Sequence, residues 1–417
     1  MYGFTTPPTT AEEARAHFAE LCGLGLELDL TRGKPCSNQL ELSSELLALP
    51  GRDDHLDQDG QDVRNYGNLV GISDLRDTWA DVLGVQPDQL LAADSSSLNI
   101  MFDLLTNAFM WGTPDSERPW KDEPTIKWIC PVPGYDFHFN MTQKFGCEML
   151  TVPMTNSGPD IDAVLQLVQD PTVKGMWLVP IFSNPTGTTT SREVAEELAR
   201  METAAPDFRI VWDNAYAVHT LTDSFPEIID VVALGSRYGH PNRFWHLSST
   251  SKITFAGAGV SFLDASKANL DWYLSMASVR GIGPNKVNQL AHARFFTSAE
   301  GVRAHMLKHA DIIRPKFHEV LKVLNHHLSG YSEVSWTDPS GGYFIAIKVP
   351  KGSATRVITL AAEAGISLTE AGCAFPLHHD PDDAYIRLAP TSPSMEDLLL
   401  ATHGLCTCIH LVLSEDS

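Results

Sequence analysis

The middle of the chain, from about residue 125 to about residue 265, alternates between short apolar runs and amphipathic stretches. The apolar runs predict strands: "TIKWICPVP", "EMLTVPM", "GMWLVPIF", "FRIVWDN", "VVALG", "FWHLSS" and "GVSFL". The amphipathic stretches predict helices: "YDFHFNMTQKFG", "DIDAVLQLVQD" and "SREVAEELARMETA". Strands that are apolar throughout are typical of a parallel sheet covered on both faces. The pattern therefore predicts an α/β fold with a mostly parallel sheet flanked by helices.

The N-terminal third carries helix-start signals. Residues 10–23 have helical spacing behind a threonine cap, and residues 71–83 predict an amphipathic helix with Ser73 as its cap. The segment "SSSLNIMFDLLTNAFM" predicts a helix that opens on serines. Between the first two helices, "LELDLTRGKP" predicts a short strand followed by a turn.

The C-terminal third changes character. Residues 285–329 predict helix, and residues 331–417 combine strands with helices near 354–364 and from Ser394 onward. The strands are "GGYFIAIKV", "ISLTEAG" and "AYIRLAP". We expect three parts: residues 1–50 as an N-terminal arm and part of a small domain, 51–300 as a large domain, and 301–417 as a small α+β domain.

Composition narrows the class of protein. The chain has 417 residues and a formal charge of −22, which disfavours binding to nucleic acid or anionic membranes. The N-terminus lacks the features of a signal peptide, and runs such as "GMWLVPIF" are far shorter than a membrane span. Seven scattered cysteines predict reduced thiols, and Cys406 and Cys408 predict structural thiols rather than a metal site. We expect a cytoplasmic protein without a metal.

One lysine stands among hydroxyls and glycines in "SSTSKITFAGAG", between two predicted strands. A desolvated amine at Lys252 could form a Schiff base, and the small residues would let backbone N–H groups approach a phosphate. An exposed loop that contains a lysine and solubilising serines would have the same sequence. The stretch alone leaves both interpretations open.

Three further polar clusters follow predicted strands or open a helix. "SNPTG" is either a turn or a way to aim the amide of Asn184 at a bound ring. Asp213 ends an apolar strand, so its carboxylate needs a partner, which is a protonated ring nitrogen or a helix cap, and Tyr216 could reach the same ligand. "DSSSLN" caps a helix, with or without a phosphate at its N-terminus.

The order of these clusters is more specific than any one of them. "PVPG" with an aromatic, "SNPTG", "DNAY" and "SSTSK" follow one another as in the fold-type I pyridoxal phosphate enzymes, and the chain resembles their class I aminotransferases from about Leu28 to Pro390. "TRGKP", "SSSLN" and "STSKITFAGAGVSF" resemble the MocR-like aspartate aminotransferase branch. Some relatives of that branch carry a DNA-binding domain in front, and about 30 residues before "TRGKP" are too few for one.

The resemblance implies a role for each matching residue. Lys252 would hold the cofactor, pyridoxal 5'-phosphate, covalently and later move the proton, and Asp213 would keep the ring nitrogen protonated. Asn184 and Tyr216 would bind the ring's phenolic oxygen, and Tyr135 would stack on the ring, although a core tyrosine is the alternative. The implied phosphate contacts are Ser96, Ser97, Ser249 and, from the neighbouring subunit of a homodimer, Tyr66.

Substrate contacts follow from the same resemblance. Arg387 would grip the substrate α-carboxylate with two parallel hydrogen bonds, and the bare backbone of Gly33 would approach the same group. One position departs from the family pattern, because Gly259 stands where an arginine usually binds the phosphate. Backbone N–H groups and serines would then have to neutralise the phosphate.

The implied activity is transfer of an amino group from an amino acid to a 2-oxo acid such as 2-oxoglutarate. A lyase or decarboxylase on the same scaffold and a non-catalytic cofactor-binding sensor are the alternatives. Arg280 in "VRGIGPNKV" fits the spacing of an arginine that binds the distal carboxylate of aspartate from the neighbouring subunit. The alternative for Arg280 is an interface salt bridge. We expect aspartate and glutamate as the preferred donors.

Overall fold

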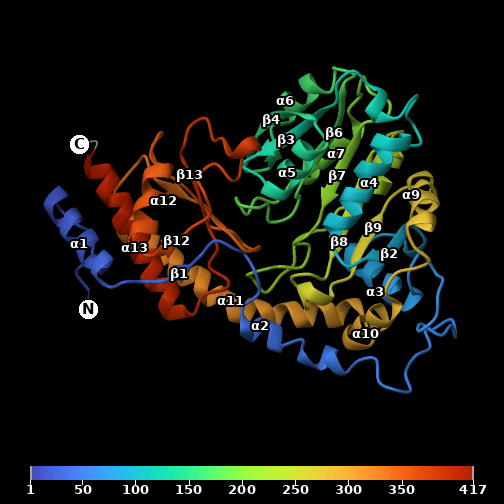
Figure 1. Cartoon of the computed structure of the whole chain (residues 1–417), viewed down its shortest axis with the longest axis horizontal. Helices are drawn as coiled ribbons and strands as arrows, with labels where there is room; N and C mark the ends of the chain where they lie inside the picture. The colour runs from blue at the N-terminus through green and yellow to red at the C-terminus, as the bar shows by residue number, and fades with distance from the viewer. Residues whose placement is uncertain (1, 416–417) are drawn as a thin grey trace.

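An eight-stranded sheet forms the centre of the larger lobe in the computed structural model, which describes residues 2–415 (Figure 1). The strand order is β2-β9-β8-β7-β6-β3-β4-β5. The bounds are β2 (Leu90–Asp94), β3 (Lys127–Val132), β4 (Glu148–Thr155), β5 (Gly158–Pro159), β6 (Val173–Leu178), β7 (Arg209–Asp213), β8 (Phe244–Ser249) and β9 (Ser261–Asp264). Strands β4, β3, β6, β7 and β8 run parallel, and β9 pairs antiparallel with both β8 and β2. The prediction of a mostly parallel α/β sheet is confirmed.

Helices cover both faces of this sheet, and alternate residues of the strands face each layer. One layer contains α4 (Ser97–Trp111) and α9 (Lys267–Arg280), which pack against Trp177 and its neighbours. The other contains α6 (Ile161–Leu167), α7 (Arg192–Arg200) and α8 (Val231–Arg237), which pack against Met176 and its neighbours. Every residue of β6, β7 and β8 is buried, which explains why most residues of these strands are apolar. Two charged exceptions, Lys174 and Arg209, each pair with a carboxylate.

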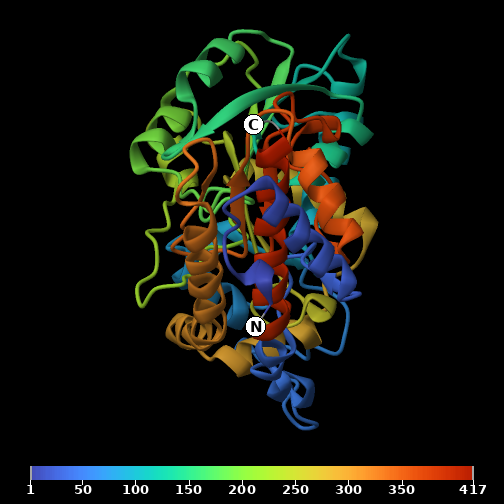
Figure 2. The ribbon, with the colours of Figure 1, turned by 90° about the vertical axis from the view of Figure 1, so that its left-hand side faces the viewer.

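A smaller lobe combines the two ends of the chain (Figure 2). Its three-stranded sheet is β10-β11-β13, and a parallel pair joins β1 to β12. The bounds are β1 (Leu28–Asp29), β10 (Ser335–Trp336), β11 (Ile345–Lys348), β12 (Ile366–Ser367), β13 (Tyr385–Leu388), α1 (Ala11–Gly23), α12 (Ala354–Glu363) and α13 (Met395–Glu415). Helix α1 packs on α13 and starts behind Thr10, whose side chain accepts a hydrogen bond from the backbone of Glu13, as predicted.

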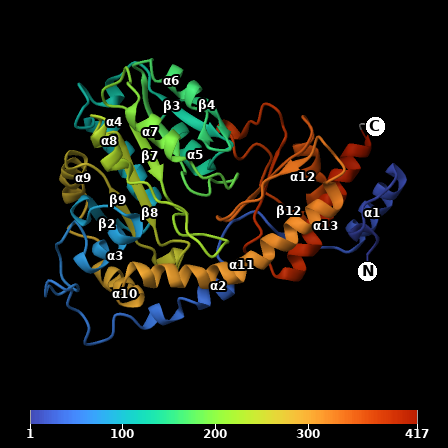
Figure 3. The same ribbon diagram turned by 180° about the vertical axis from the view of Figure 1, so that it is seen from behind.

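One long helix, α11 (Ala299–Leu328), runs from the large sheet to the smaller lobe, with α2 (Ser37–Glu41) beside it (Figure 3). The remaining helices are α3 (Ser73–Leu83), α5 (Asp136–Lys144) and α10 (Lys286–Phe296). The pairing of β1 with β12 brings the N-terminal arm onto the C-terminal part. Domain boundaries at residues 50 and 300 stay a prediction.

Two local predictions are wrong. "VVALG" is not a strand but the start of α8, because the side chain of Asp230 caps the helix by accepting a hydrogen bond from Ala233 N. Ser73 is not a cap, since Ile72 holds that position and the Ser73 hydroxyl donates to Asp59 Oδ2 at 2.6 Å. In each case a hydrogen bond to an aspartate side chain decides the local structure, and the apolar pattern of the sequence does not reveal that bond.

The helix predicted from Ser394 onward is α13, which begins at Met395. Helix α13 is long and apolar enough to cross a membrane by length and composition, yet 67% of that stretch is buried inside the protein. Its buried residues pack against α1, α11 and α12. We interpret α13 as the core helix of the smaller lobe.

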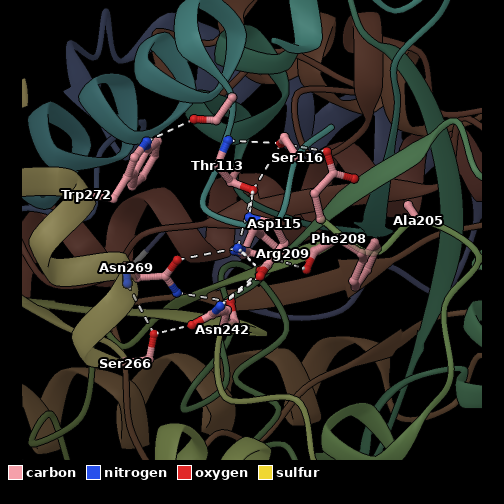
Figure 4. A network of polar contacts seen from close by, with 12 residues as sticks. Thr113, Asp115, Ser116, Ala205, Phe208, Arg209, Asn242, Ser266, Asn269 and Trp272 are labelled. Atoms are coloured by element: carbon pink, nitrogen blue, oxygen red, sulfur yellow. Dashed lines mark hydrogen bonds and ion pairs between the residues drawn. The ribbon is translucent and has the colours of Figure 1, made fainter. Parts of the chain in front are cut away.

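A buried arginine stabilises the edge of the sheet opposite to the predicted site (Figure 4). The guanidinium of Arg209 donates to Asp115 Oδ2 at 2.5 Å, to Thr113 at 3.3 Å and to Asn269 at 3.4 Å. Asn242 donates to the same carboxylate of Asp115. The network ties the start of β7 to the loop after α4 and to the start of α9, so it fixes the sheet without contributing to the opposite edge.

Candidate functional site

The carboxyl ends of the central strands bring most of the predicted residues to one edge of the sheet. Asp213 is the last residue of β7 and Ser249 is the last residue of β8. Asn184 follows β6, Tyr135 follows β3, and Ser96 caps α4 after β2. Because the strands between β3 and β8 are parallel, these ends meet at a common edge, where such folds bind ligands.

Asp213 and His138 form a fully buried pair at this edge. His138 Nε2 donates to Asp213 Oδ2 at 3.0 Å, and both side chains are at most 3% exposed. The other carboxylate oxygen, Oδ1, is buried and has no donor among residues 2–415. A buried acceptor without a partner is costly, so this oxygen favours a ligand that brings an N–H group.

Aromatic rings surround the same pair. The ring of His138 stacks on Trp177 with centroids 4.4 Å apart, and Tyr135 packs edge-on against it at 4.9 Å. Burial raises the pKa of Tyr135 and of Tyr216 well above its usual value. Both phenols are therefore protonated at neutral pH and can act as hydrogen-bond donors.

Lys252 lies in the turn after β8, half-buried. Its Nζ is 4.8 Å from the ring centroid of Tyr216, and no carboxylate of residues 2–415 lies within ion-pairing distance of it. Two buried groups hold its backbone carbonyl instead: Tyr343 Oη donates at 3.3 Å and His219 Nε2 lies at 3.4 Å. The backbone of Lys252 is thus fixed, while its amine is left without a counter-ion.

Arg387 reaches the site from the smaller lobe. Its Nη1 contacts Asn184 Oδ1 at 3.4 Å and Asp136 Oδ1 at 3.3 Å, and its guanidinium lies over the ring of Phe344 at 5.1 Å. The contact with Arg387 orients the amide of Asn184, whose Nδ2 group donates to no acceptor among residues 2–415. Gly33 lies behind Phe344, and a Cβ there would come within 2.4 Å of that ring.

Serines gather around the start of α4 and the turn after β8. The Ser96 hydroxyl accepts from Leu98 N at 3.3 Å, and the hydroxyls of Ser249 and Ser251 are 2.7 Å apart. Gly259 closes this region, because a Cβ on it would lie 2.6 Å from the carbonyl oxygen of Ser95. An arginine at Gly259 has no room, which explains the departure from the family pattern in steric terms.

Tyr66 and Arg280 lie apart from the other predicted residues, on a face that they share. Tyr66 is 82% exposed, and its carbonyl accepts from Lys286 just beyond Arg280. Arg280 Nη1 contacts Asp94 Oδ2 at 2.9 Å and Asp103 Oδ2 at 3.0 Å. It lines a cavity of about 550 Å³ that also includes Ser95 and Gly259.

Three contributors were not predicted from the sequence: His138, Asp136 and Phe344. His138 could have been found, since it follows Tyr135 by three residues at a helix start, a spacing that puts both on one face. Asp136 and Phe344 act through Arg387, which is 251 residues from Asp136 in the chain. No local signal joins residues at that distance.

Comparisons with known proteins agree with this geometry. A family profile described as aspartate amino-transferase matches residues 5–417. The aspartate aminotransferase of Corynebacterium glutamicum is 58% identical over 97% of this chain and 94% of its own. A crystal structure of an aspartate transaminase from that organism superimposes with a TM-score of 0.96, at 58% identity, over 97% of this chain and 96% of that one. The α-aminoadipate aminotransferase of Thermus thermophilus, solved with N-(5'-phosphopyridoxyl)-L-leucine, shares the fold with a TM-score of 0.74 at 21% identity over 95% of both chains.

Proposed function

The chain belongs to the aspartate amino-transferase family, and from this premise we propose that it moves an amino group from aspartate or glutamate to a 2-oxo acid such as 2-oxoglutarate. The chain is a fold-type I aminotransferase that depends on pyridoxal phosphate, as the resemblance predicted, and these predictions are confirmed. The roles of single residues, the amino donor and the homodimer are proposed.

The residues present fit the cofactor. The unpartnered Oδ1 of Asp213 suits a protonated ring nitrogen, and the free Nδ2 of Asn184 suits a phenolic oxygen. The amine of Lys252, without a counter-ion, suits covalent attachment. Serines at the start of α4 and after β8 suit a phosphate, since a helix N-terminus attracts anions. The orphaned oxygen of Asp213 is the single observation that carries the assignment furthest.

Each residue would then do one thing. Bound pyridoxal phosphate supplies an electron sink for the carbon that loses its proton. Once released from the cofactor, the Nζ of Lys252 would take that proton and return it to a neighbouring carbon, as general base and then general acid. Asp213 would accept a hydrogen bond from the ring nitrogen, and His138 holds the carboxylate in place. Tyr135 contributes a ring face, and Arg387 binds the substrate α-carboxylate.

The donor preference rests on the family and on Arg280. We assign Arg280 to the distal carboxylate of aspartate in the neighbouring subunit's site. Its two carboxylate neighbours, Asp94 and Asp103, hold it within its own chain, so a substrate would have to draw it away from them. The alternative, an arginine that only stabilises this face of the molecule, predicts no donor discrimination.

An exposed face with apolar side chains supports a homodimer in which each site takes residues from both subunits. The two residues that the resemblance assigns to the neighbouring site, Tyr66 and Arg280, lie on one face together with Val279 and Ile282, which are 84% and 60% exposed. Mixing Lys252→Ala chains with Tyr66→Ala chains should restore activity, because one site of the hybrid is then intact.

A cytoplasmic location is supported by seven cysteines that all remain free thiols.

A donor panel tests the proposal. With 2-oxoglutarate as the acceptor, kcat/KM for aspartate should exceed that for alanine about a hundredfold or more, since an unpaired charge costs several kcal/mol. Arg280→Ala should lower kcat/KM for aspartate and leave that for alanine nearly unchanged. The matched control is Arg237→Ala, which removes an exposed arginine at the end of α8.

Other outcomes have distinct meanings. Equal loss for both donors in Arg280→Ala would assign Arg280 to structure rather than to substrate. Pyruvate and ammonia formed without an acceptor would indicate a lyase. No turnover of any amino acid by protein that binds the cofactor would indicate a sensor.

A further inference from the structure

The arginine assigned to the substrate carboxylate already has a carboxylate neighbour. Asp136 is the first residue of α5, and its Oδ1 lies 3.3 Å from Nη1 of Arg387 on β13. The side chains are 20% and 8% exposed. This ion pair joins the two lobes across the site, and neither residue has another charged partner among residues 2–415.

The contacts of the Arg387 guanidinium are all long. Nη1 is 3.3 Å from Asp136 and 3.4 Å from Asn184, and Nη2 is 3.3 Å from the hydroxyl of Thr369. Its Nε is buried without an acceptor. Guanidinium–carboxylate pairs usually form bonds of about 2.7–2.9 Å, often two in parallel. Asp136 therefore supplies an opposite charge to Arg387 but leaves much of the hydrogen-bonding capacity of the guanidinium unused.

The backbone that carries Asp136 is held independently of this ion pair. Gly134 N donates to Ala374 O at 2.8 Å, which links the start of α5 to the smaller lobe. Two residues further along α5, His138 is fixed by Asp213 and by Trp177. Loss of the Asp136 carboxylate should therefore leave the helix in place and change only the charge that faces Arg387.

We propose that Asp136 is a resident counter-ion of Arg387, which the substrate α-carboxylate displaces on binding. Asp136 thereby acts as a specificity-determining residue. A ligand binds at Arg387 only if it carries a carboxylate that binds this arginine more tightly than Asp136 does. An amine without a carboxylate leaves the Asp136–Arg387 pair intact. The inference rests on the proposed role of Arg387 and adds to it a built-in competitor.

The test measures binding of a carboxylate that cannot react. Succinate has no amino group, so calorimetric titration of the holoenzyme reports affinity without turnover. If the paired state accounts for about nine tenths of the free enzyme, Asp136→Asn should lower the Kd for succinate about tenfold. KM for amino donors should fall in parallel, while kcat does not rise. Asp136→Ser serves as a second variant that also lacks the charge.

Controls separate this proposal from the proposed function. Asp162→Asn removes an exposed acid from the first turn of α6 that has no arginine partner among residues 2–415, and it should leave the Kd unchanged. Arg387→Gln should abolish succinate binding, and if it does not, the proposed role of Arg387 is wrong. If Arg387→Gln abolishes binding while Asp136→Asn weakens it or leaves it unchanged, Asp136 is not a competitor, and the resident counter-ion is disproved while the proposed function stands.

Discussion

At the scale of residues, two buried histidine–aspartate pairs differ in position. His138–Asp213 lies at the site, and His246–Asp264 lies further along the neighbouring strands with a distance of 2.9 Å. Burial raises the pKa of Asp264, which favours its protonated form. Only the first pair stands where the strand ends open onto Lys252, so only it should affect the cofactor.

The matched pair of variants follows from this difference. Asp213→Asn removes the carboxylate that faces the ring nitrogen and should raise the Kd for pyridoxal phosphate by about two hundredfold or more, since breaking a buried pair costs about 3–5 kcal/mol. Asp264→Asn should lower the melting temperature and leave that Kd within about twofold. Titration of apoprotein by absorbance measures both. Equal effects on the Kd would show that Asp213 acts only through stability.

The sequence predicted the residues that follow strands and missed those that act across the fold. Lys252, Asp213 and Asn184 were predictable because each interrupts or follows an apolar run. The orphaned oxygen of Asp213 and the contact of Asp136 with Arg387 depend on packing between segments far apart in the chain. Contacts between distant segments produce no periodic pattern in the sequence, so they could not be predicted from it.

At the scale of elements, the turn before β9 packs directly against the start of α4. Gly259 is the contact point, where a Cβ would lie 2.6 Å from Ser95 O and 3.1 Å from the Ser251 hydroxyl. A side chain at Gly259 would therefore push the turn away from the segment that contains Ser95. Gly257 in the same turn has no atom within 4 Å of an added Cβ.

These two glycines give a second matched comparison. Gly259→Ala should destabilise the protein by about 1–3 kcal/mol, the usual cost of overpacking, and should weaken phosphate binding. Gly257→Ala should do neither. Thermal denaturation of the apoprotein and its titration with pyridoxal phosphate measure the two effects. Unchanged values for Gly259→Ala would mean that the turn moves without cost.

Element types were predicted well where spacing decided them. The strands that end at the site and the helices α1, α4 and α13 follow from apolar patterning. The α8 segment was mistaken for a strand because five apolar or small residues carry no clear period, and the cap from Asp230 decides the outcome. Short segments of this kind need their neighbours to be interpreted.

At the scale of the whole molecule, buried neutral histidines couple stability to pH. Burial lowers the pKa of His219 and His309 to about 3, and the charge of Lys252 adds to the effect at His219. The unfolded chain titrates near the ordinary value of about 6.5. Between these values the unfolded state binds more protons than the native state, so acidification favours unfolding.

Urea denaturation at two pH values tests this coupling. From about pH 7.5 to about pH 5.5 the free energy of unfolding should fall by about 1 kcal/mol for each such histidine. His309→Gln should reduce the fall by one such step. The control, His318→Gln, removes a side chain that is 74% exposed and should leave the slope unchanged. An unchanged slope in His309→Gln would show that His309 titrates in the native state as it does in the unfolded chain.

The most direct test of the whole account is to find where the cofactor attaches. Holoenzyme treated with borohydride and digested should yield one phosphopyridoxyl peptide, and mass spectrometry should place the group on Lys252. Lys252→Arg protein treated in the same way should carry none. A phosphopyridoxyl group on another lysine of the treated wild-type protein, or none at all, would contradict the assignment of Lys252 and of the site built around it.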